Sequence, residues 1–109
     1  MARNKIKTAG ETQEGGKARE SLFAAIAALQ DPNECEAFLN DLCTPQELDA
    51  LAGRWQVARL LDREVPYRAI YEQTGVSTAT VTRVARVLRD GDSGYQILLE
   101  RLEGKRGTT

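Results

Sequence analysis

The chain has 109 residues, which suits a single domain; 41% of them are apolar, 28% are charged and none is histidine. The longest apolar run covers residues 22–29, which is far shorter than the roughly 18 residues that a membrane span needs. The lack of histidine argues against histidine-based catalysis and most zinc sites, and two cysteines do not make a disulfide framework. We therefore expect a protein of the reducing cytoplasm with no membrane partner, no metal and no other cofactor.

The net charge of −1 hides an uneven distribution of charged residues. Residues 21–53 contain six acidic residues and no Lys or Arg, whereas residues 54–89 contain seven Arg and three acidic residues. Such a chain can present one basic face while it stays almost neutral overall. The alternative is that an acidic helix and a basic helix simply attract each other.

The residues that start and stop helices along the chain predict an all-α fold. Residues 1–16 are polar and glycine-containing, so we expect a flexible arm there, a domain at 17–104 and a flexible tail at 105–109. No segment alternates apolar and polar residues in the manner of a strand. The predicted helices cover about 17–30, 32–42, 45–63, 66–74, 78–90 and 94–103.

Capping signals support these boundaries. Asp31-Pro32 and Thr44-Pro45 each place a capping side chain before a proline at the first helical position, with Glu three residues after the cap. Gly75 ends the fourth helix where a positive φ is expected, Ser77 or Thr78 caps the fifth helix, and Ser93 opens the sixth with a capping box. The third helix carries an apolar stripe with helical spacing, formed by Leu48, Leu51, Trp55, Ala58 and Leu61.

The first helix is apolar on all sides between Leu22 and Leu29. A surface helix of a small monomer normally shows a polar face, so we expect a second copy of the chain to cover this helix. The alternative is an alanine-rich central helix whose alanines tolerate solvent. The predicted dimer core consists of Leu22, Phe23, Ile26 and Leu29.

Residues 66–89 combine a short helix, a turn with Gly75 and a second helix, which is the pattern of a helix-turn-helix. Ile70 and Val76 can fill the angle between the two helices. The apolar side of the second helix, which packs on the core, holds Val81, Val84, Ala85 and Leu88. At about 100° per residue, the opposite side holds Ala79, Arg83 and Arg86, flanked by Thr80 and Thr82.

The exposed side of the second helix suits double-stranded DNA. Small residues at its start let the backbone approach a major groove, Thr side chains can contact base edges, and Arg83 and Arg86 can reach guanine or phosphate. Arg68, on the first helix, would lie near the phosphate backbone. A non-catalytic protein-binding module, whose Arg-rich face meets an acidic partner, is the alternative. The predicted DNA-contacting residues are Arg68, Ser77, Thr78, Ala79, Thr80, Thr82, Arg83 and Arg86.

The segment Thr78–Arg83 resembles the recognition helix of the tryptophan repressor. The span from Leu22 to Leu102 is similar to the YerC/YecD branch of the Trp repressor-like superfamily, through Arg54–Ala58, Pro66–Ile70 and Ser77–Arg86. The resemblance implies an intertwined, all-helical homodimer that acts on DNA near the nucleoid as a transcription regulator of the repressor type. It also implies DNA contacts by Arg68, Thr78, Ala79, Thr80, Thr82 and Arg83.

The resemblance does not carry over the tryptophan site. In the tryptophan repressor, a glycine helps to make room for the indole ring of the ligand, and this chain has Val84 at that position. A small serine farther along the same helix of the repressor corresponds to Val87. An arginine that clasps the ligand aligns with Gly53, although Arg54 is adjacent. One interpretation of Arg54 and Arg59 is that they bind the carboxylate of an effector. The other is that they form ordinary surface ion pairs with Asp49, Asp62 or Glu64. Val84 and Val87 place stiff, branched side chains where a planar ligand would need room, so tryptophan is disfavoured as the effector, which is left unknown. The alternative is that Val84 faces the core and leaves a reshaped pocket near Arg54.

Overall fold

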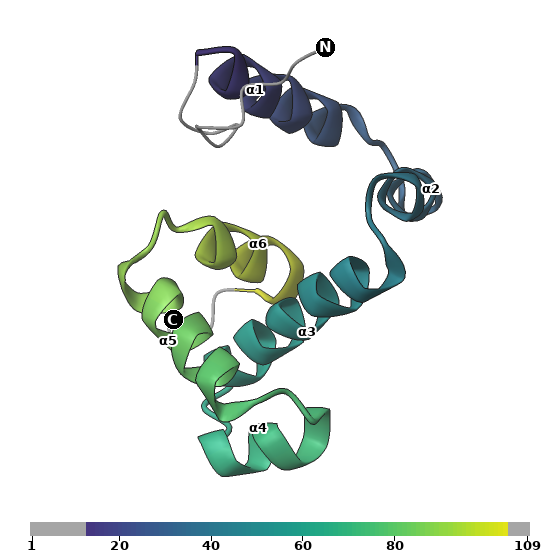
Figure 1. Ribbon diagram of the computed structural model, residues 1–109. Coiled ribbons are helices and arrows are strands. Elements are labelled where there is room, and N and C mark those ends of the chain that lie inside the picture. Colours follow the sequence, from purple (N-terminus) through teal and green to yellow (C-terminus); the bar gives the residue numbers. More distant parts are fainter. Residues whose placement is uncertain (1–12, 105–109) are drawn as a thin grey trace. The chain divides into compact units, whose positions relative to one another are not determined.

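The computed structural model describes residues 13–104 and shows only helices in this part of the chain, which confirms the all-α prediction (Figure 1). α1 begins at Gln13, inside the stretch predicted to be an arm, while residues 1–12 and the predicted tail at 105–109 lie outside the described residues. None of the described helices is both long and apolar enough to cross a membrane. The six helices are α1 (Gln13–Ala28), α2 (Pro32–Leu42), α3 (Pro45–Asp62), α4 (Tyr67–Thr74), α5 (Thr78–Asp90) and α6 (Gly94–Glu103).

The chain divides into two compact units, with α1 and α2 in the first and α3 to α6 in the second. In the first unit, the carboxylate of Asp31 accepts a hydrogen bond from the Glu34 amide at 2.9 Å, which confirms the predicted start of α2. The Glu34 carboxylate accepts in turn from the Gln30 amide at 2.9 Å. α1 exposes the large side chains of Phe23 and Ile26, which are 61% and 45% accessible.

The predicted capping box of α3 is present in the second unit. The Glu47 amide donates to the Thr44 hydroxyl at 3.1 Å, and the Thr44 amide donates to the Glu47 carboxylate at 2.8 Å. These two bonds satisfy backbone donors that the first turn of a helix leaves without partners. After α3, Glu64 adopts a positive φ of 64° and turns the chain toward α4.

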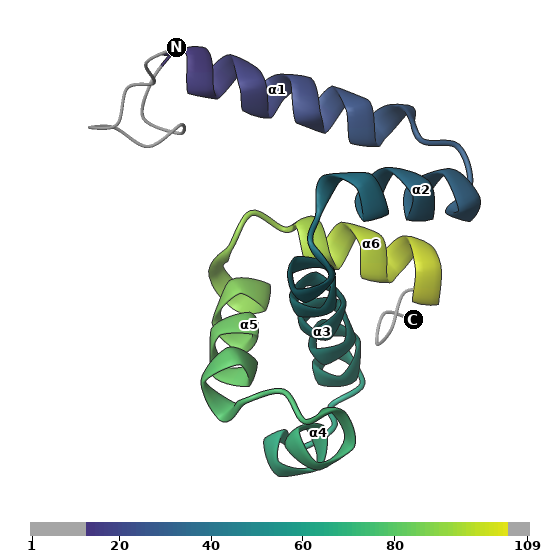
Figure 2. The same ribbon diagram turned by 45° about the vertical axis from the view of Figure 1, so that its right-hand side comes forward.

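The core of the second unit lies where α3, α4 and α5 meet. Ile70 of α4 and Val81 and Val84 of α5 are buried, and Val76 packs against them, as the sequence predicts. The predicted stripe of α3 is wrong in part, because Leu51 is 41% exposed whereas Val57 is fully buried. The reason is that α3 contacts α4, α5 and α6, so its buried residues do not form one stripe (Figure 2).

The start of α6 differs from the prediction. Ser93 adopts a left-handed backbone with φ 73°, and its side chain makes no capping bond. A capping side chain aligns with the first amides when its own backbone is extended, so this conformation removes the predicted capping box. Gln96 instead donates from its side chain to the Leu88 carbonyl at 2.9 Å and ties α6 to α5.

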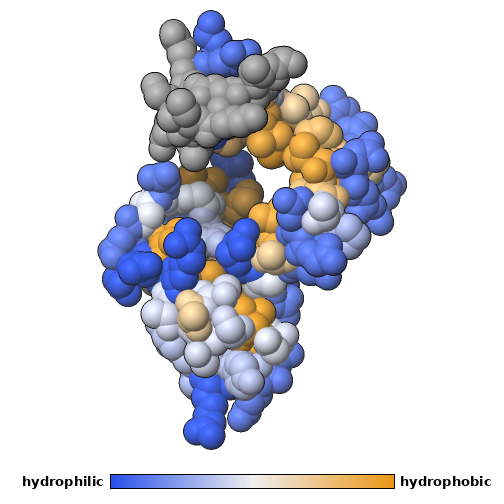
Figure 3. Space-filling model, in the orientation of Figure 1, coloured by the Kyte–Doolittle hydropathy of each residue, from blue (hydrophilic) through white to orange (hydrophobic). Residues whose placement is uncertain are grey.

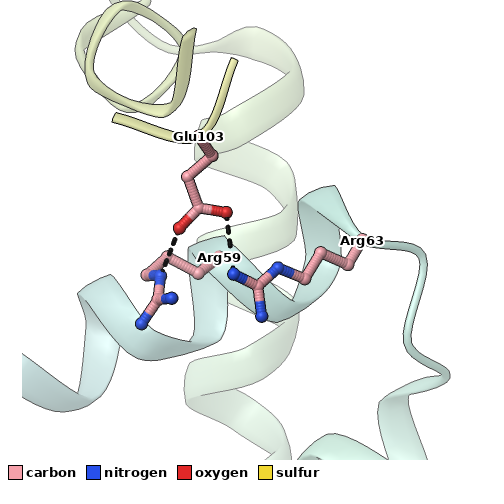
Figure 4. A network of polar contacts seen from close by, with 3 residues as sticks. All are labelled: Arg59, Arg63 and Glu103. Carbon is pink, nitrogen blue, oxygen red and sulfur yellow. Dashed lines mark hydrogen bonds and ion pairs between the residues drawn. The ribbon is translucent and has the colours of Figure 1, made fainter. Parts of the chain in front are cut away.

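The other end of α6 is tied to α3 by two ion pairs (Figure 4). The Glu103 carboxylate accepts from Arg59 Nε at 2.5 Å and from an Arg63 guanidinium nitrogen at 3.0 Å. The hydrogen bond from Arg59 is the main reason that the pKa of Glu103 lies below its usual range; desolvation opposes this lowering, while Arg63 adds to it. Arg59 therefore has a partner on α6 that was not among the predicted ones.

Candidate nucleic-acid interface

α4 and α5 form a helix-turn-helix whose turn is fixed by local hydrogen bonds. Gly75 has a φ of 74°, a conformation that glycine adopts without strain, and its amide donates to the Tyr71 carbonyl at 2.8 Å. The Thr74 hydroxyl donates to the Ile70 carbonyl at 2.7 Å and accepts from the Val76 amide at 3.0 Å. Thr74 therefore closes the turn from both sides, a role that sequence reasoning missed although threonine directly precedes the turn glycine.

Ser77 is the N-cap of α5, one of the two residues predicted for this role. Its hydroxyl oxygen accepts from the Thr80 amide and the hydroxyl donates to the Thr80 hydroxyl oxygen, both at 3.1 Å. Thr80 is half-buried, so it lies at the edge of the exposed side of α5. Two of the predicted DNA-contacting side chains are therefore joined to each other in the cap.

The exposed side of α5 holds most of the remaining predicted residues. Arg83 and Arg86 make no ion pair or hydrogen bond within residues 13–104, whereas Arg89 lies 3.3 Å from the carboxylate of Asp90. Two unpaired guanidinium groups thus lie one turn apart on a helix whose opposite side is buried. The predicted residues exposed on α5 are Thr78, Ala79, Thr82, Arg83 and Arg86.

Arg68 lies on the outer side of α4. Its side chain is 88% exposed, and its Nε is 3.6 Å from the carboxylate of Glu72 one turn farther along. An exposed pair of this kind contributes little to stability, so Arg68 can exchange Glu72 for another anion at small cost. The structure thus brings Arg68 and α5 into one helix-turn-helix, in contact through their two helices.

The valines that replace small residues of the tryptophan repressor lie in different environments. Val84 is 1% exposed and belongs to the core cluster, whereas Val87 is 36% exposed. Val84 thus faces the core, which was the alternative to its lining a ligand slot, while Val87 lies toward the exposed side of α5. Gly53 of α3 closely approaches the turn: a Cβ atom added there would be 3.4 Å from a methyl carbon of Val76.

The two arginines of the predicted effector site differ in their partners, and the described residues form no metal site. Arg59 is already engaged by Glu103, while Arg54 is half-buried and makes no hydrogen bond or ion pair within residues 13–104. Nowhere between residues 13 and 104 do three or more Cys, Asp or Glu side chains gather in a way that could hold a metal ion. Trp55 stacks on Tyr95 of α6, with ring centroids 6.3 Å apart, and packs against the core.

Known proteins place this helix-turn-helix in a family. YerC of Bacillus subtilis (strain 168) is 43% identical over 88 residues, which cover 81% of this chain and 85% of that protein. A Trp operon repressor homolog of Actinobacillus succinogenes is 43% identical over 69 residues, covering 62% of this chain and 67% of that protein. A solved TrpR-like protein from Eubacterium eligens matches with a TM-score of 0.76 and 42% identity over 93% of this chain and 96% of that one. The family model for the Trp repressor protein matches residues 17–103, and the chain therefore belongs to the Trp repressor family.

Proposed function

We propose that this protein is a sequence-specific DNA-binding transcription regulator, most simply a repressor, that inserts the start of α5 into the major groove. The observation that carries the proposal is the pair of unpaired guanidinium groups, Arg83 and Arg86, on the exposed side of α5. A charged group without a protein partner on a helix-turn-helix is suited to meet phosphates or guanine edges. Membership of a family that includes Trp operon repressor homologs supports the same function.

In this proposal, the side chains at the start of α5 recognise the DNA sequence. Thr78, Ala79 and Thr82 are small and exposed, so the helix backbone can approach base edges and the thymine methyl group closely. Thr80 lies at the edge of this surface, and its bond to Ser77 orients its hydroxyl group. Arg68 would hold the register of the protein on the phosphate backbone, which carries no sequence information itself.

The DNA-binding unit is a homodimer in this proposal. α1 presents Phe23 and Ile26 to solvent, and in Figure 3 hydrophobic residues of α1 and α2 are visible on the surface. Burial of such residues against a second copy is favourable by about 25 cal/mol for each Å² of apolar surface removed from water. Two copies would also present two recognition helices to half-sites about one helical turn apart.

DNA binding is proposed to need no tryptophan. Val84 already fills part of the contact between α3 and α5, where a planar ligand would need room. The turn before α5 is closed by Thr74 and its start is capped by Ser77, without any ligand. A recognition helix held in this way is ready to bind DNA on its own or in response to another signal.

Selection of bound fragments from genomic DNA tests the function directly. The purified protein should enrich fragments with two half-sites, and its affinity for them should fall steeply as salt rises, because phosphate contacts release counterions. A protein-binding adaptor would show neither behaviour, and failure to enrich any fragment at low salt would contradict the proposal.

The variant Arg86→Ala tests the proposed contact between α5 and the DNA backbone. If Arg86 contacts a phosphate, the variant should bind specific and random DNA more weakly alike, and its salt slope should fall by about one unit. Thr82→Ala should instead alter the choice among sequences and change binding to random DNA little. Unchanged binding of Arg86→Ala to random DNA would contradict the phosphate assignment.

A further inference from the structure

Two tyrosines of α4 are exposed without any role in the core. Tyr67 and Tyr71 are each 49% accessible, and neither belongs to the buried cluster or to the residues packed against it. They lie four positions apart on one side of the helix, where side chains are neighbours. Tyrosine combines a large apolar ring with a hydrogen-bonding hydroxyl and is typical of interfaces rather than of bare surface.

Arg68 lies beside these tyrosines. It lies three positions before Tyr71, which in turn lies four positions after Tyr67, so Tyr71 neighbours both side chains on the outer side of α4. Glu72, the acidic residue of α4, lies on the far side of Arg68 from the tyrosines. An anionic surface would therefore meet α4 from the tyrosine side and avoid the Glu72 carboxylate.

The position of Tyr71 is fixed by the turn. Its carbonyl accepts the amide of Gly75, and the next carbonyl toward the N-terminus, that of Ile70, accepts the Thr74 hydroxyl. α4 is therefore anchored to the turn at the end that carries Tyr71, and it packs against α5. A contact made by Tyr71 would act on the same rigid unit that positions the recognition helix.

We propose that Tyr67 and Tyr71 grip the sugar–phosphate backbone beside the major groove, with the phenolic hydroxyls donating to phosphate oxygens and the rings covering the adjacent sugars. The inference rests on the proposed function, because it assigns further residues to the same DNA interface. The first helix of a helix-turn-helix crosses the backbone, and tyrosine is one of the side chains that donate to phosphate. The partner is thus any duplex that α5 can enter, regardless of sequence.

The proposed tyrosine–phosphate contacts are uncharged, so their effect on the salt dependence of DNA binding differs from that of Lys or Arg. Each phosphate neutralised by Lys or Arg releases counterions and steepens the salt dependence of binding. A phenolic hydroxyl neutralises no charge, so its loss weakens binding without changing the salt slope. The contact should also act equally on specific and random sequences, since phosphates carry no sequence information.

Phenylalanine substitutions test the proposal in the full-length protein. Tyr67→Phe combined with Tyr71→Phe should lower affinity for a random duplex and for a selected fragment by about tenfold, with an unchanged salt slope. Tyr95→Phe is the matched control, because it removes the same hydroxyl from α6, where the ring stacks on Trp55. Arg86→Ala, measured in the same titration, shows what the loss of a charged contact looks like.

Fluorine NMR gives a second readout that does not depend on affinity. The chain has three tyrosines, so protein labelled with fluorotyrosine gives three signals that single Phe variants assign. Addition of the random duplex should shift the signals of Tyr67 and Tyr71 and leave that of Tyr95 nearly unchanged. Labelled protein without DNA, measured at several concentrations, is the control for contacts between copies of the chain.

The outcomes separate the inference from the function on which it rests. If Arg86→Ala weakens binding while the double Phe variant binds like the wild type, the tyrosine assignment is wrong and DNA binding stands. Signals of Tyr67 and Tyr71 that move with protein concentration rather than with DNA would assign the patch to a second copy and overturn the proposal. If the wild type binds no DNA at any salt concentration, the proposed function itself fails.

Discussion

Thr74 illustrates how one side chain can decide the geometry of a functional unit. Its hydroxyl is both donor and acceptor, so it satisfies the Ile70 carbonyl at the end of α4 and the Val76 amide in the turn. Threonine hydroxyls often form such local bonds near helix ends and turns, which is why they compete with regular helix there. The orientation of α5 relative to α4 is thus set by short-range bonds around Gly75.

A second residue-scale constraint lies at the other end of α5, at Gly91. A Cβ atom at this position would lie 2.7 Å from the Val87 carbonyl oxygen and 2.9 Å from a Val87 methyl carbon. Gly91→Ala should therefore destabilise the protein by about 1–3 kcal/mol, which urea unfolding would measure. Gly94→Ala is the control, because a Cβ atom there meets nothing within 4 Å and should change stability little. Equal stability of both variants would contradict the steric explanation.

At the scale of helices, α6 is held onto α3 and α5 by polar contacts at both of its ends. Gln96 bonds to α5 near the start, and Glu103 bonds to Arg59 and Arg63 near the end. Between them Leu99 is buried, at 3% exposure. α3 thereby carries the helix-turn-helix on one part of its surface and α6 on another.

The Glu103 contacts predict a pH dependence of stability. Because the pKa of Glu103 is lowered in the folded protein, its stabilisation is complete above the ordinary Glu pKa, about 4.3, and is lost as pH falls through the folded-state pKa. Glu103→Gln should therefore unfold more easily than the wild type at neutral pH, and the difference should shrink in acid. Urea unfolding at a series of pH values measures it.

Glu100→Gln is the matched control for Glu103→Gln. Glu100 lies on the same helix, and its side chain takes part in no ion pair within residues 13–104. The control should keep the wild-type dependence of stability on pH. A difference between wild type and Glu103→Gln that stays constant down to strong acid would show that the ion pairs do not contribute.

At the scale of the whole molecule, assembly is the first expectation to test. Light scattering at micromolar concentration should give twice the chain mass of 12.0 kDa if, as proposed, a second copy covers the exposed apolar residues of α1. Ile26→Asp should dissociate or unfold the protein, since it places a carboxylate in an apolar interface. Ser21→Asp adds the same charge at a polar position of α1 and should leave the dimer intact. A wild-type mass near that of one chain would contradict the dimer.

Control by tryptophan is the second expectation at this scale. Calorimetric titration of the protein with L-tryptophan should show no micromolar binding, because Val84 already packs in the core between α3 and α5. A mobility assay should give the same DNA affinity with and without tryptophan. Tenfold tighter DNA binding with tryptophan, a coupling of about 1.4 kcal/mol, would overturn the proposal.

The amino-acid sequence by itself determined the helices and the helix-turn-helix. Capping signals at Asp31 and Thr44 and the glycines at 75 and 91 act within a few residues, so local chemistry was enough to place the helix ends near them. The buried side of α5 could also be predicted from the sequence, because Val81 and Val84 lie at helical spacing and pack into a single core. The family followed from the same local segments.

Only the tertiary structure decided which residues of α3 are buried, what Arg59 binds and whether Ser93 caps α6. α3 is contacted by three helices from different directions, so burial there depends on the neighbours rather than on one stripe. Arg59 and Glu103 are 44 positions apart, and no local pattern joins them. Ser93 adopts a left-handed backbone, and Gln96, three residues farther on, bonds to the end of α5 instead of completing a capping box. In each case the deciding partner belongs to another helix and becomes a neighbour only after the helices have packed.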